Sequence, residues 1–190
     1  MVISYFGENC FRLQSGDTSL LVDAANNRLK ADAALRTEVP VDAIGFPDPS
    51  GTIEIAFPGE YETKGIEIRG FPVSAESGKV IKTGYLVRWE EVKYAILPRF
   101  SKLGDKEVIE EVGEPDVLFL PLGGEGLAPD AALKFVRQIE PSVVIPSYSR
   151  TPLEFLKSMG HKGAAEEKFV FKSKDIVGKK NHIVLLVAKA

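Results

Sequence analysis

The sequence predicts a single α/β domain over residues 1–190, in which helices cover a sheet. Two patterns support this fold class: short strands separated by turn residues fill the first half, and strands alternate with helices in the second half. In addition, no linker, low-complexity segment or repeat of fixed period divides the chain. A chain of 190 residues is long enough to bury one core of ordinary size.

The strands expected in the first half are short apolar or alternating runs that end at turn residues. They cover residues 2–6, 10–14, 19–22, 43–46, 53–57, 66–71, 85–89 and 93–97. Glu90 and Glu91 are the expected turn between the last two of these strands. Residues 26–36 predict a short helix or an irregular connection, 47–51 predict a turn, and 58–65 predict a turn or tight loop.

The second half predicts three helices between buried strands. Asp105 is positioned to cap a helix over 106–112 that Gly113 ends, and Pro129 suits the first turn of the next helix. Residues 151–154 read as a capping box for a third helix over 155–159. The strands are expected at 117–120, 143–145, 169–171 and 183–187.

Composition excludes several classes of function. Lys and Arg number 24 against 27 Asp and Glu, for a net charge of −3, so there is no basic surplus for a nucleic-acid backbone. The apolar runs are too short to span a bilayer, and the first residues do not resemble a secretory signal. A single cysteine, Cys10, fits a reducing compartment, and we expect the protein to be cytoplasmic.

Histidine is too scarce for a multi-histidine metal centre. Zinc sites usually combine three or four imidazole, thiolate or carboxylate ligands. Only His161 and His182 are present: His161 follows a predicted helix, and His182 lies in an apolar strand as a core or edge residue. We therefore expect no bound metal and no other cofactor.

Six segments of the chain, taken in order, carry a family resemblance. They are residues 3–11, 20–23, 58–66, 116–124, 129–134 and 140–146. Together they resemble the metallo-β-lactamase fold, and in particular its small metal-dependent hydrolases of the ascorbate-phosphate-lactonase type. The resemblance implies an αββα sandwich of mixed sheets with helices on the outer faces.

The same resemblance places the family's metal ligands at positions that carry other side chains here. Glu8 stands where the family has a histidine, and residues 46–50 replace its His-x-His-x-Asp-His run, leaving only Asp48 as a possible ligand. Residues 98–101 replace the turn with the metal-bridging aspartate, and Ser147 and Tyr148 replace the last histidine. The resemblance thus implies a degenerate member that lacks the histidine ligands on which metal-assisted hydrolysis depends.

The candidate site residues are those that the resemblance or the strand ends place near the family's cleft. They are Asp48, Tyr148, Glu8, Glu60 and Arg150, with Asn9, Tyr61, Ser147 and Ser149 beside them. Each also has a structural explanation: the aspartate suits a turn, the two glutamates suit solvated loops, and the arginine suits a surface ion pair.

A nucleophile or a phosphate loop has less support. Ser147 or Cys10 as a nucleophile would need a nearby base, and neither histidine has a sequence context that supplies one. The glycines at 123, 124 and 126 lack the Gly-Lys-Ser/Thr ending of a P-loop, and a tight turn between strand and helix explains them.

Three hypotheses follow. The first is a metal-free relative of these hydrolases that acts as a binding or assembly module for a small molecule or a protein, and not for nucleic acid or membrane. The second is a hydrolase with relocated or oxygen-only ligands drawn from Asp23, Asp48, Glu8 and Glu60. The third is an unrelated α/β domain. If Phe46 and Phe100 filled the cleft, an inert scaffold would be favoured.

Overall fold

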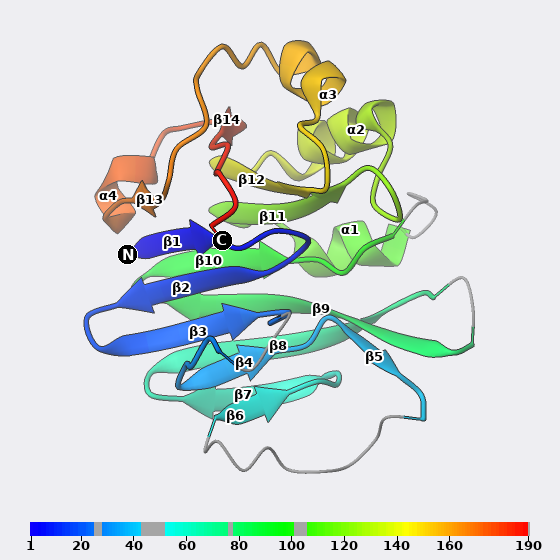
Figure 1. The fold of residues 1–190 in the computed structure, drawn as a ribbon, viewed down its shortest axis with the longest axis vertical. Helices are drawn as coiled ribbons and strands as arrows, with labels where there is room; N and C mark the ends of the chain where they lie inside the picture. Colours follow the sequence, from blue (N-terminus) through cyan, green and yellow to red (C-terminus); the bar gives the residue numbers. More distant parts are fainter. Residues whose placement is uncertain (25–27, 43–51, 76–77, 101–105, 190) are drawn as a thin grey trace.

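Two facing sheets form the centre of the molecule (Figure 1). The computed structural model describes residues 1–24, 28–42, 52–75, 78–100 and 106–189. In this part of the chain the smaller sheet has six strands: β13 (Phe169–Val170), β1 (Val2–Tyr5), β2 (Phe11–Ser15), β3 (Thr18–Val22), β4 (Ala33–Leu35) and β6 (Ile53–Ile55), in spatial order. In this sheet β1 lies next to the edge, where it pairs with β2 on one side and with β13, from the far end of the chain, on the other.

The larger sheet has eight strands within the same ranges. Their order is β14 (His182–Ile183), β12 (Val143–Tyr148), β11 (Val117–Leu122), β10 (Val92–Ile96), β9 (Val80–Trp89), β8 (Ile66–Val73) and β7 (Gly59–Thr63), with β5 (Glu38–Pro40) paired to β9. Strands β10, β11, β12 and β14 are mutually parallel, whereas β7 to β10 are antiparallel, so the sheet is mixed.

The main core lies between the two sheets. Along β8, Ile66 and Ile68 point into this core, and Glu67 and Arg69 between them point to solvent, as the alternation of a strand requires. Tyr94 on β10 and Phe11 on β2 are likewise fully buried in this core.

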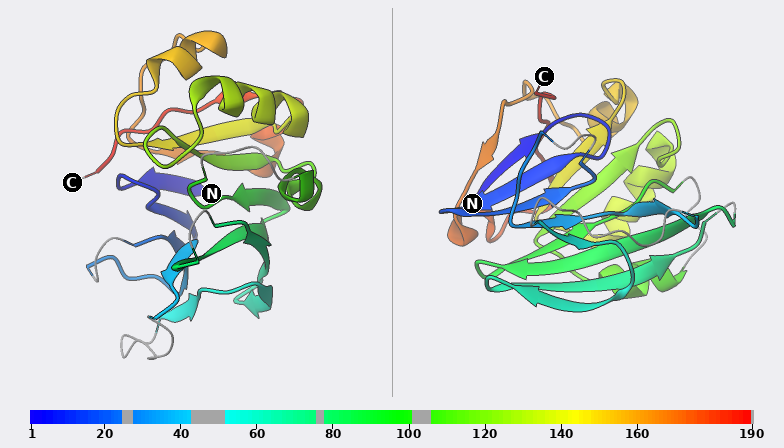
Figure 2. Two further views of the ribbon diagram at one scale, coloured as in Figure 1. Left: turned by 90° about the vertical axis from the view of Figure 1, so that its right-hand side faces the viewer. Right: turned by 60° about the horizontal axis from the view of Figure 1, so that its bottom comes forward.

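A second core lies under three helices, α1 (Lys106–Val112), α2 (Pro129–Ile139) and α3 (Leu153–Ser158). These helices lie along the outer face of the larger sheet (Figure 2). Phe135 of α2 and Phe155 of α3 pack there with Leu118 and Val144 from the outer face of β11 and β12. These parallel strands are buried on both faces, which explains their nearly continuous apolar sequences. The remaining helix, α4 (Ser173–Ile176), places Ile176 in the main core.

The outer face of the smaller sheet is covered differently. Its apolar cluster contains Cys10, Leu21 and Ala34, against which Phe6 and Leu29 pack. All five come from strands and loops, so no described helix residue belongs to this cluster. The sandwich of mixed sheets is confirmed, while helices on this second outer face stay a prediction.

Most elements lie where the sequence predicts them. Helices α1 and α2 match the expected positions, Gly113 ends α1 in the left-handed conformation, and Glu90 and Glu91 form the hairpin turn with φ of 54° and 62°. The strand expected at 43–46, the turn at 47–51 and the capping role of Asp105 lie outside the described residues.

Three local predictions are wrong. Residues 33–35, expected in a helix or irregular connection, form β4, because they pair in parallel with β3 and β6. Residues 59–63, expected in a loop, form the edge strand β7 on β8. Residues 151–154 make no capping box: Pro152 holds the N-cap position of α3, and a proline side chain cannot accept a hydrogen bond there.

The two-layer sandwich also removes the hypothesis of an unrelated α/β domain. No helix in the described ranges is long and apolar enough to cross a membrane.

Candidate functional site

A small cleft opens at the end of the sandwich where β10, β11 and β12 end. Carboxyl ends of neighbouring parallel strands are the usual place for ligand contacts in such sheets. The cleft has a volume of about 200 Å³. It is lined by Glu8, Arg99, Pro121, Leu122, Gly123, Gly124, Glu125, Ser147, Tyr148 and Ser149.

The guanidinium of Arg99 is the cation of this cleft. Its Nε and Nη2 donate to the two carboxylate oxygens of Glu38, at 3.3 and 3.2 Å. Its Nη1 lies 3.7 Å from Oε2 of Glu8 and 3.8 Å from Oε2 of Glu125. The hydrogen bonds with Glu38 raise the pKa of Arg99 above its usual value, so this side chain carries a permanent positive charge among three carboxylates.

The backbone of Arg99 is held as firmly as its side chain. Its N–H donates to Oε1 of Glu38 at 2.9 Å, and its carbonyl accepts a hydrogen bond from the ammonium of Lys82. The guanidinium is therefore fixed in orientation as well as in charge.

Asn9 is the centre of a buried hydrogen-bond network under the cleft. Its Nδ2 donates to Oδ2 of Asp23 at 2.8 Å and to the carbonyl of Leu97 at 3.2 Å. Its Oδ1 accepts a hydrogen bond from the hydroxyl of Ser147 at 2.9 Å. One amide thus connects the smaller sheet, through Asp23, with β10 and β12 of the larger sheet.

Asp23 ends this network. Its Oδ1 accepts a hydrogen bond from the backbone N–H of Thr37 at 2.7 Å, and its Oδ2 accepts one from the Thr37 hydroxyl at 2.5 Å. Burial raises the pKa of the Asp23 carboxyl above its ordinary value, against the opposite effect of the hydrogen bonds from Thr37 and Asn9. Both oxygens already have protein donors.

Tyr148 lines the cleft, but its hydroxyl is used elsewhere. The phenol donates to the carbonyl of Leu186 at 2.6 Å. The backbone N–H of Tyr148 donates to the hydroxyl of Tyr5 at 2.9 Å, and that hydroxyl lies 2.8 Å from the carbonyl of Tyr148. Burial raises the pKa of the Tyr148 phenol, which makes it a poor proton donor or acceptor near neutral pH.

The structure brings some of the predicted residues together and separates others. Glu8, Ser147, Tyr148 and Ser149 share the cleft. Arg150 instead lines a neighbouring cavity of about 230 Å³.

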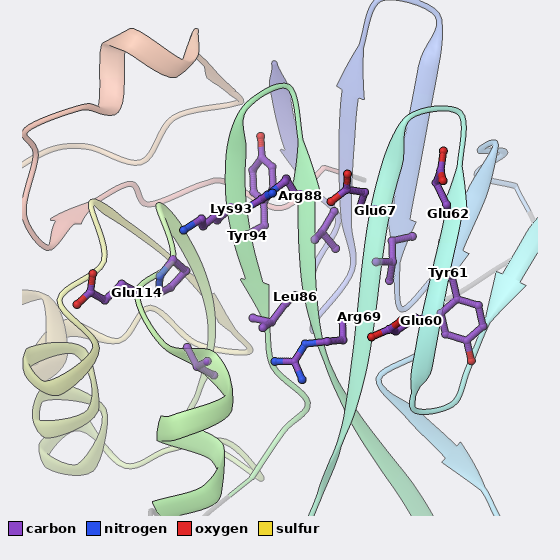
Figure 3. A pocket seen from close by; sticks show the side chains of 14 residues that line it. Glu60, Tyr61, Glu62, Glu67, Arg69, Leu86, Arg88, Lys93, Tyr94 and Glu114 are labelled. Atoms are coloured by element: carbon purple, nitrogen blue, oxygen red, sulfur yellow. The ribbon is translucent and has the colours of Figure 1, made fainter.

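The expectation that Glu60 and Tyr61 lie near the cleft is wrong. Both belong to β7, and they line a groove on the outer face of the larger sheet (Figure 3). The reason is that 59–63 extends the sheet as an edge strand, four strands away from β11, instead of forming a loop. Asp48 lies outside the described residues.

The residues in the cleft do not fit a transition metal. Within the described ranges no three His, Cys, Asp or Glu side chains are placed to hold a metal ion. Among the described residues, Glu8 is the ligand-type side chain at an expected ligand position, and its carboxylate already pairs with the guanidinium of Arg99, which repels a further cation.

Arg99, Glu38 and Glu125 are the site residues that sequence reasoning missed. A signal for Arg99 was present in the sequence. Arg99 lies in 98–101, where the family resemblance places the metal-bridging aspartate, and the oppositely charged Glu8 stands where the family has a histidine. Glu38 had no such signal, because its contact with Arg99 spans 61 residues.

Comparisons with known proteins agree on one family. Residues 2–148 match the family model described as the β-lactamase superfamily domain. A UPF0173 metal-dependent hydrolase of Methanopyrus kandleri is 32% identical over 113 residues, which are 53% of this chain and 49% of that protein. The chain therefore matches about half the length of this curated relative.

Solved structures share the fold. A protein of Thermotoga maritima, classed among Zn-dependent hydrolases of the metallo-β-lactamase superfamily, has a TM-score of 0.76 at 20% identity, with 98% of each chain covered. The metallo hydrolase Igni18 of Ignicoccus hospitalis has a TM-score of 0.64 at 20% identity, covering 90% of this chain and 99% of its own.

Proposed function

The chain belongs to the β-lactamase superfamily, and on this premise we propose that it is a metal-free member that acts as a binding module rather than as a hydrolase. The observation that carries this proposal is the position of Arg99. Its guanidinium lies among the carboxylates of Glu8, Glu38 and Glu125, where the resemblance places the family's metal ligands.

Electrostatics explains why this arrangement opposes metal binding. Two unit charges 4 Å apart interact by about 1 kcal/mol in water and about 4 kcal/mol near a protein surface. A divalent ion beside the guanidinium would meet twice that repulsion from Arg99. Glu8, Glu38 and Glu125 would attract the ion, but each already pairs with the guanidinium, so the ion could bind them only by displacing it. In addition, Asn9 and Ser147 offer neutral oxygens that are already hydrogen-bonded to each other, and neutral oxygens are weak ligands for zinc.

What the cleft retains is suited to binding. It combines a fixed cation, two exposed carboxylates and the exposed Ser149 beside left-handed glycines at 123 and 124. A site of about 200 Å³ takes one polar group, so the ligand would be a small molecule or the tip of a protein side chain.

The second hypothesis, a hydrolase with relocated or oxygen-only ligands, draws these from Asp23, Asp48, Glu8 and Glu60, of which Asp48 lies outside the described residues. Glu60 lines a different groove, Glu8 is paired with Arg99, and both oxygens of Asp23 have donors. This alternative predicts a rise in melting temperature with Mg²⁺ or Mn²⁺, because an ion that binds only the folded state stabilises it.

The deciding experiment measures metal content and metal response together. The full chain is purified without chelators and analysed by plasma mass spectrometry, and its melting is followed with added Zn²⁺, Mn²⁺ and Mg²⁺. We expect substoichiometric metal and no shift in melting temperature for the native protein. Stoichiometric zinc or iron with hydrolase activity would overturn the proposal, and a Mg²⁺- or Mn²⁺-dependent shift would favour the second hypothesis.

A variant sharpens this test. Arg99→Gln removes the cation and keeps a hydrogen-bonding side chain of similar length, while Arg88→Gln removes a cation from the outer face of β9 as a control. If repulsion by Arg99 excludes metal, only Arg99→Gln gains a metal-dependent rise in melting temperature.

A further inference from the structure

The outer face of β7, β8, β9 and β10 carries a row of four charged side chains. Glu62 lies opposite Glu67, Glu67 lies opposite Arg88, and Arg88 lies opposite Lys93, each pair on neighbouring strands. All four side chains are exposed, and Figure 3 shows them along the upper part of one groove. We name these four residues the charge row.

The charge row is arranged as two halves of opposite sign. Side chains directly opposite each other in a sheet interact, and like charges in such pairs are unfavourable. The row nevertheless has an acidic pair, Glu62 and Glu67, followed by a basic pair, Arg88 and Lys93. An alternating order would satisfy the same charges within one molecule, so this order leaves an acidic half and a basic half for an outside partner.

The described residues do not neutralise the row from within. None of its four side chains makes an ion pair or a side-chain hydrogen bond with a residue in those ranges, although Glu67 and Arg88 are neighbours. The nearby Arg69 differs, because its Nη1 is 2.6 Å from Oε2 of Glu111 in α1. Glu60, across from Arg69, and Glu114, beyond Lys93, complete the rim of the groove.

The groove beneath the row is large and partly apolar. It has a volume of about 630 Å³, and Leu86, Val112 and Pro115 contribute apolar side chains to its lining. Ile68 and Val87 also border it, but their side chains belong to the main core.

Helices α1 to α3 lie over the outer face of β10 to β12 (Figure 2), and the second core beneath them also contains Phe71 and Val73 from the last part of β8. No described helix covers the outer face of β7 or of the first part of β8, where Glu62 and Glu67 are exposed. The outer face is therefore raised by the helices over β10 to β12 and recessed over β7 and the first part of β8.

We infer that a second copy of this chain packs on this face. A two-fold axis relates the two copies; it lies in the plane of their contact, runs parallel to the strands and passes above the line between β8 and β9. Such an axis reverses the order of the row in the partner. The acidic half of each copy then faces the basic half of the other, and the raised half of each copy lies over the recessed half of the other. A two-fold interface requires self-complementarity of this kind, in charge and in shape.

The spacing supports the match. Neighbouring strands are about 4.8 Å apart, so the centres of the acidic and basic halves are roughly 10 Å apart, and this separation is the same in both copies. The contact would also cover the exposed edge strand β7, whose unpaired backbone would otherwise be open to association.

The test is a charge swap on the full chain, followed by analytical ultracentrifugation. The acidic double variant Glu62→Lys with Glu67→Lys makes the whole row basic, and the basic double variant Arg88→Glu with Lys93→Glu makes it acidic. We expect the native chain to be a dimer. For each double variant alone, we expect the dissociation constant of the dimer to rise at least about tenfold.

An equimolar mixture of the two double variants restores the dimer, because every contact then joins a basic half to an acidic half. A variant that fails to fold is recognised by its circular dichroism. In that case the single variants Glu67→Lys and Arg88→Glu serve as the complementary pair.

Several results would overturn the inference. They are a monomeric native chain over the whole concentration series, a dimer that neither double variant weakens, or a mixture that stays monomeric. A dimer that does not weaken with salt also contradicts it, because exposed charge pairs are screened. None of these outcomes bears on the metal content of the cleft, so this inference and the proposed function fail independently.

Discussion

Ser147 and Asn9 are joined by a hydrogen bond of 2.9 Å across 138 residues of sequence. Asn9 follows β1 of the smaller sheet and Ser147 lies on β12 of the larger sheet, so the bond connects the two layers at the cleft. Both residues are almost fully buried. The amide of Asn9 therefore has a structural role that its exposed neighbour Glu8 lacks.

We predict that Asn9→Ala lowers the free energy of unfolding by about 3 kcal/mol, because it leaves Asp23, Leu97 and Ser147 without their partner in a buried position. Chemical denaturation measures this loss. Gln14→Ala, which removes one exposed hydrogen bond to Gly16, is the control and should change stability little. Equal effects of the two changes would show that the network is not stabilising.

Arg99→Gln should lower the free energy of unfolding by about 1–2 kcal/mol, because the carboxylate of Glu38 is 18% exposed and loses its charged partner. The matched change Arg88→Gln, on the exposed face of β9, should have almost no effect at a protein concentration low enough to dissociate the proposed dimer. The comparison is made by urea denaturation at low protein concentration. If Arg88→Gln lowered the free energy of unfolding more than Arg99→Gln, the stabilising role of the Arg99–Glu38 ion pair would be contradicted.

Two buried tyrosines on neighbouring strands should respond in opposite ways to loss of the hydroxyl. The hydroxyl of Tyr85 donates to the carbonyls of Arg36 and Ile55, at 2.9 and 3.1 Å, whereas the buried hydroxyl of Tyr94 has no hydrogen-bond partner among the described residues. We expect Tyr85→Phe to cost about 1–2 kcal/mol and Tyr94→Phe to be neutral or stabilising. Thermal melting of both variants tests this, and a destabilised Tyr94→Phe would reveal an unrecognised partner.

Asp23 and Asp32 should contribute to the pH dependence of stability with opposite signs. Burial raises the pKa of Asp23 above 3.8, so the folded state binds its proton more tightly than the unfolded state. The stability advantage of native protein over Asp23→Asn should therefore shrink as pH rises from 3.8 through the folded pKa.

For Asp32, hydrogen bonds from Lys64 and the backbone of Ser19 lower the pKa below 3.8. The advantage over Asp32→Asn should be present above 3.8 and be lost as pH falls through the folded pKa. Urea denaturation of the three proteins across the acidic range measures both slopes. Slopes of the same sign would contradict one of the two assignments.

The parts of the fold that depend on local signals could be predicted from the sequence. Pro129 marks the start of α2, and Gly113 marks the end of α1. Strand β7 could not be recognised in this way, because Glu60 and Glu62 face solvent, and the strand exists only through its pairing with β8.

The candidate site was predictable in the same partial sense. The resemblance located Glu8 and Ser147, since both lie next to strands with recognisable patterns. The resemblance could not predict the ion pairs of Arg99, because Glu38 and Glu125 contact the guanidinium from segments that are far apart in the sequence. Such contacts depend on tertiary structure and leave no periodic signal in the chain.

The pairing of β1 with both β2 and β13 has a consequence for how the molecule forms. Val2 and Ile3 contact Val170 and Phe169, and the backbone N–H of Lys189 donates to the carbonyl of Tyr5. The first strand therefore becomes an interior strand only after Phe169 and Val170 have been made. Closing so long a loop is entropically costly and slows folding. Until then one edge of β1 has no neighbouring strand, and its backbone groups are open to association with another chain.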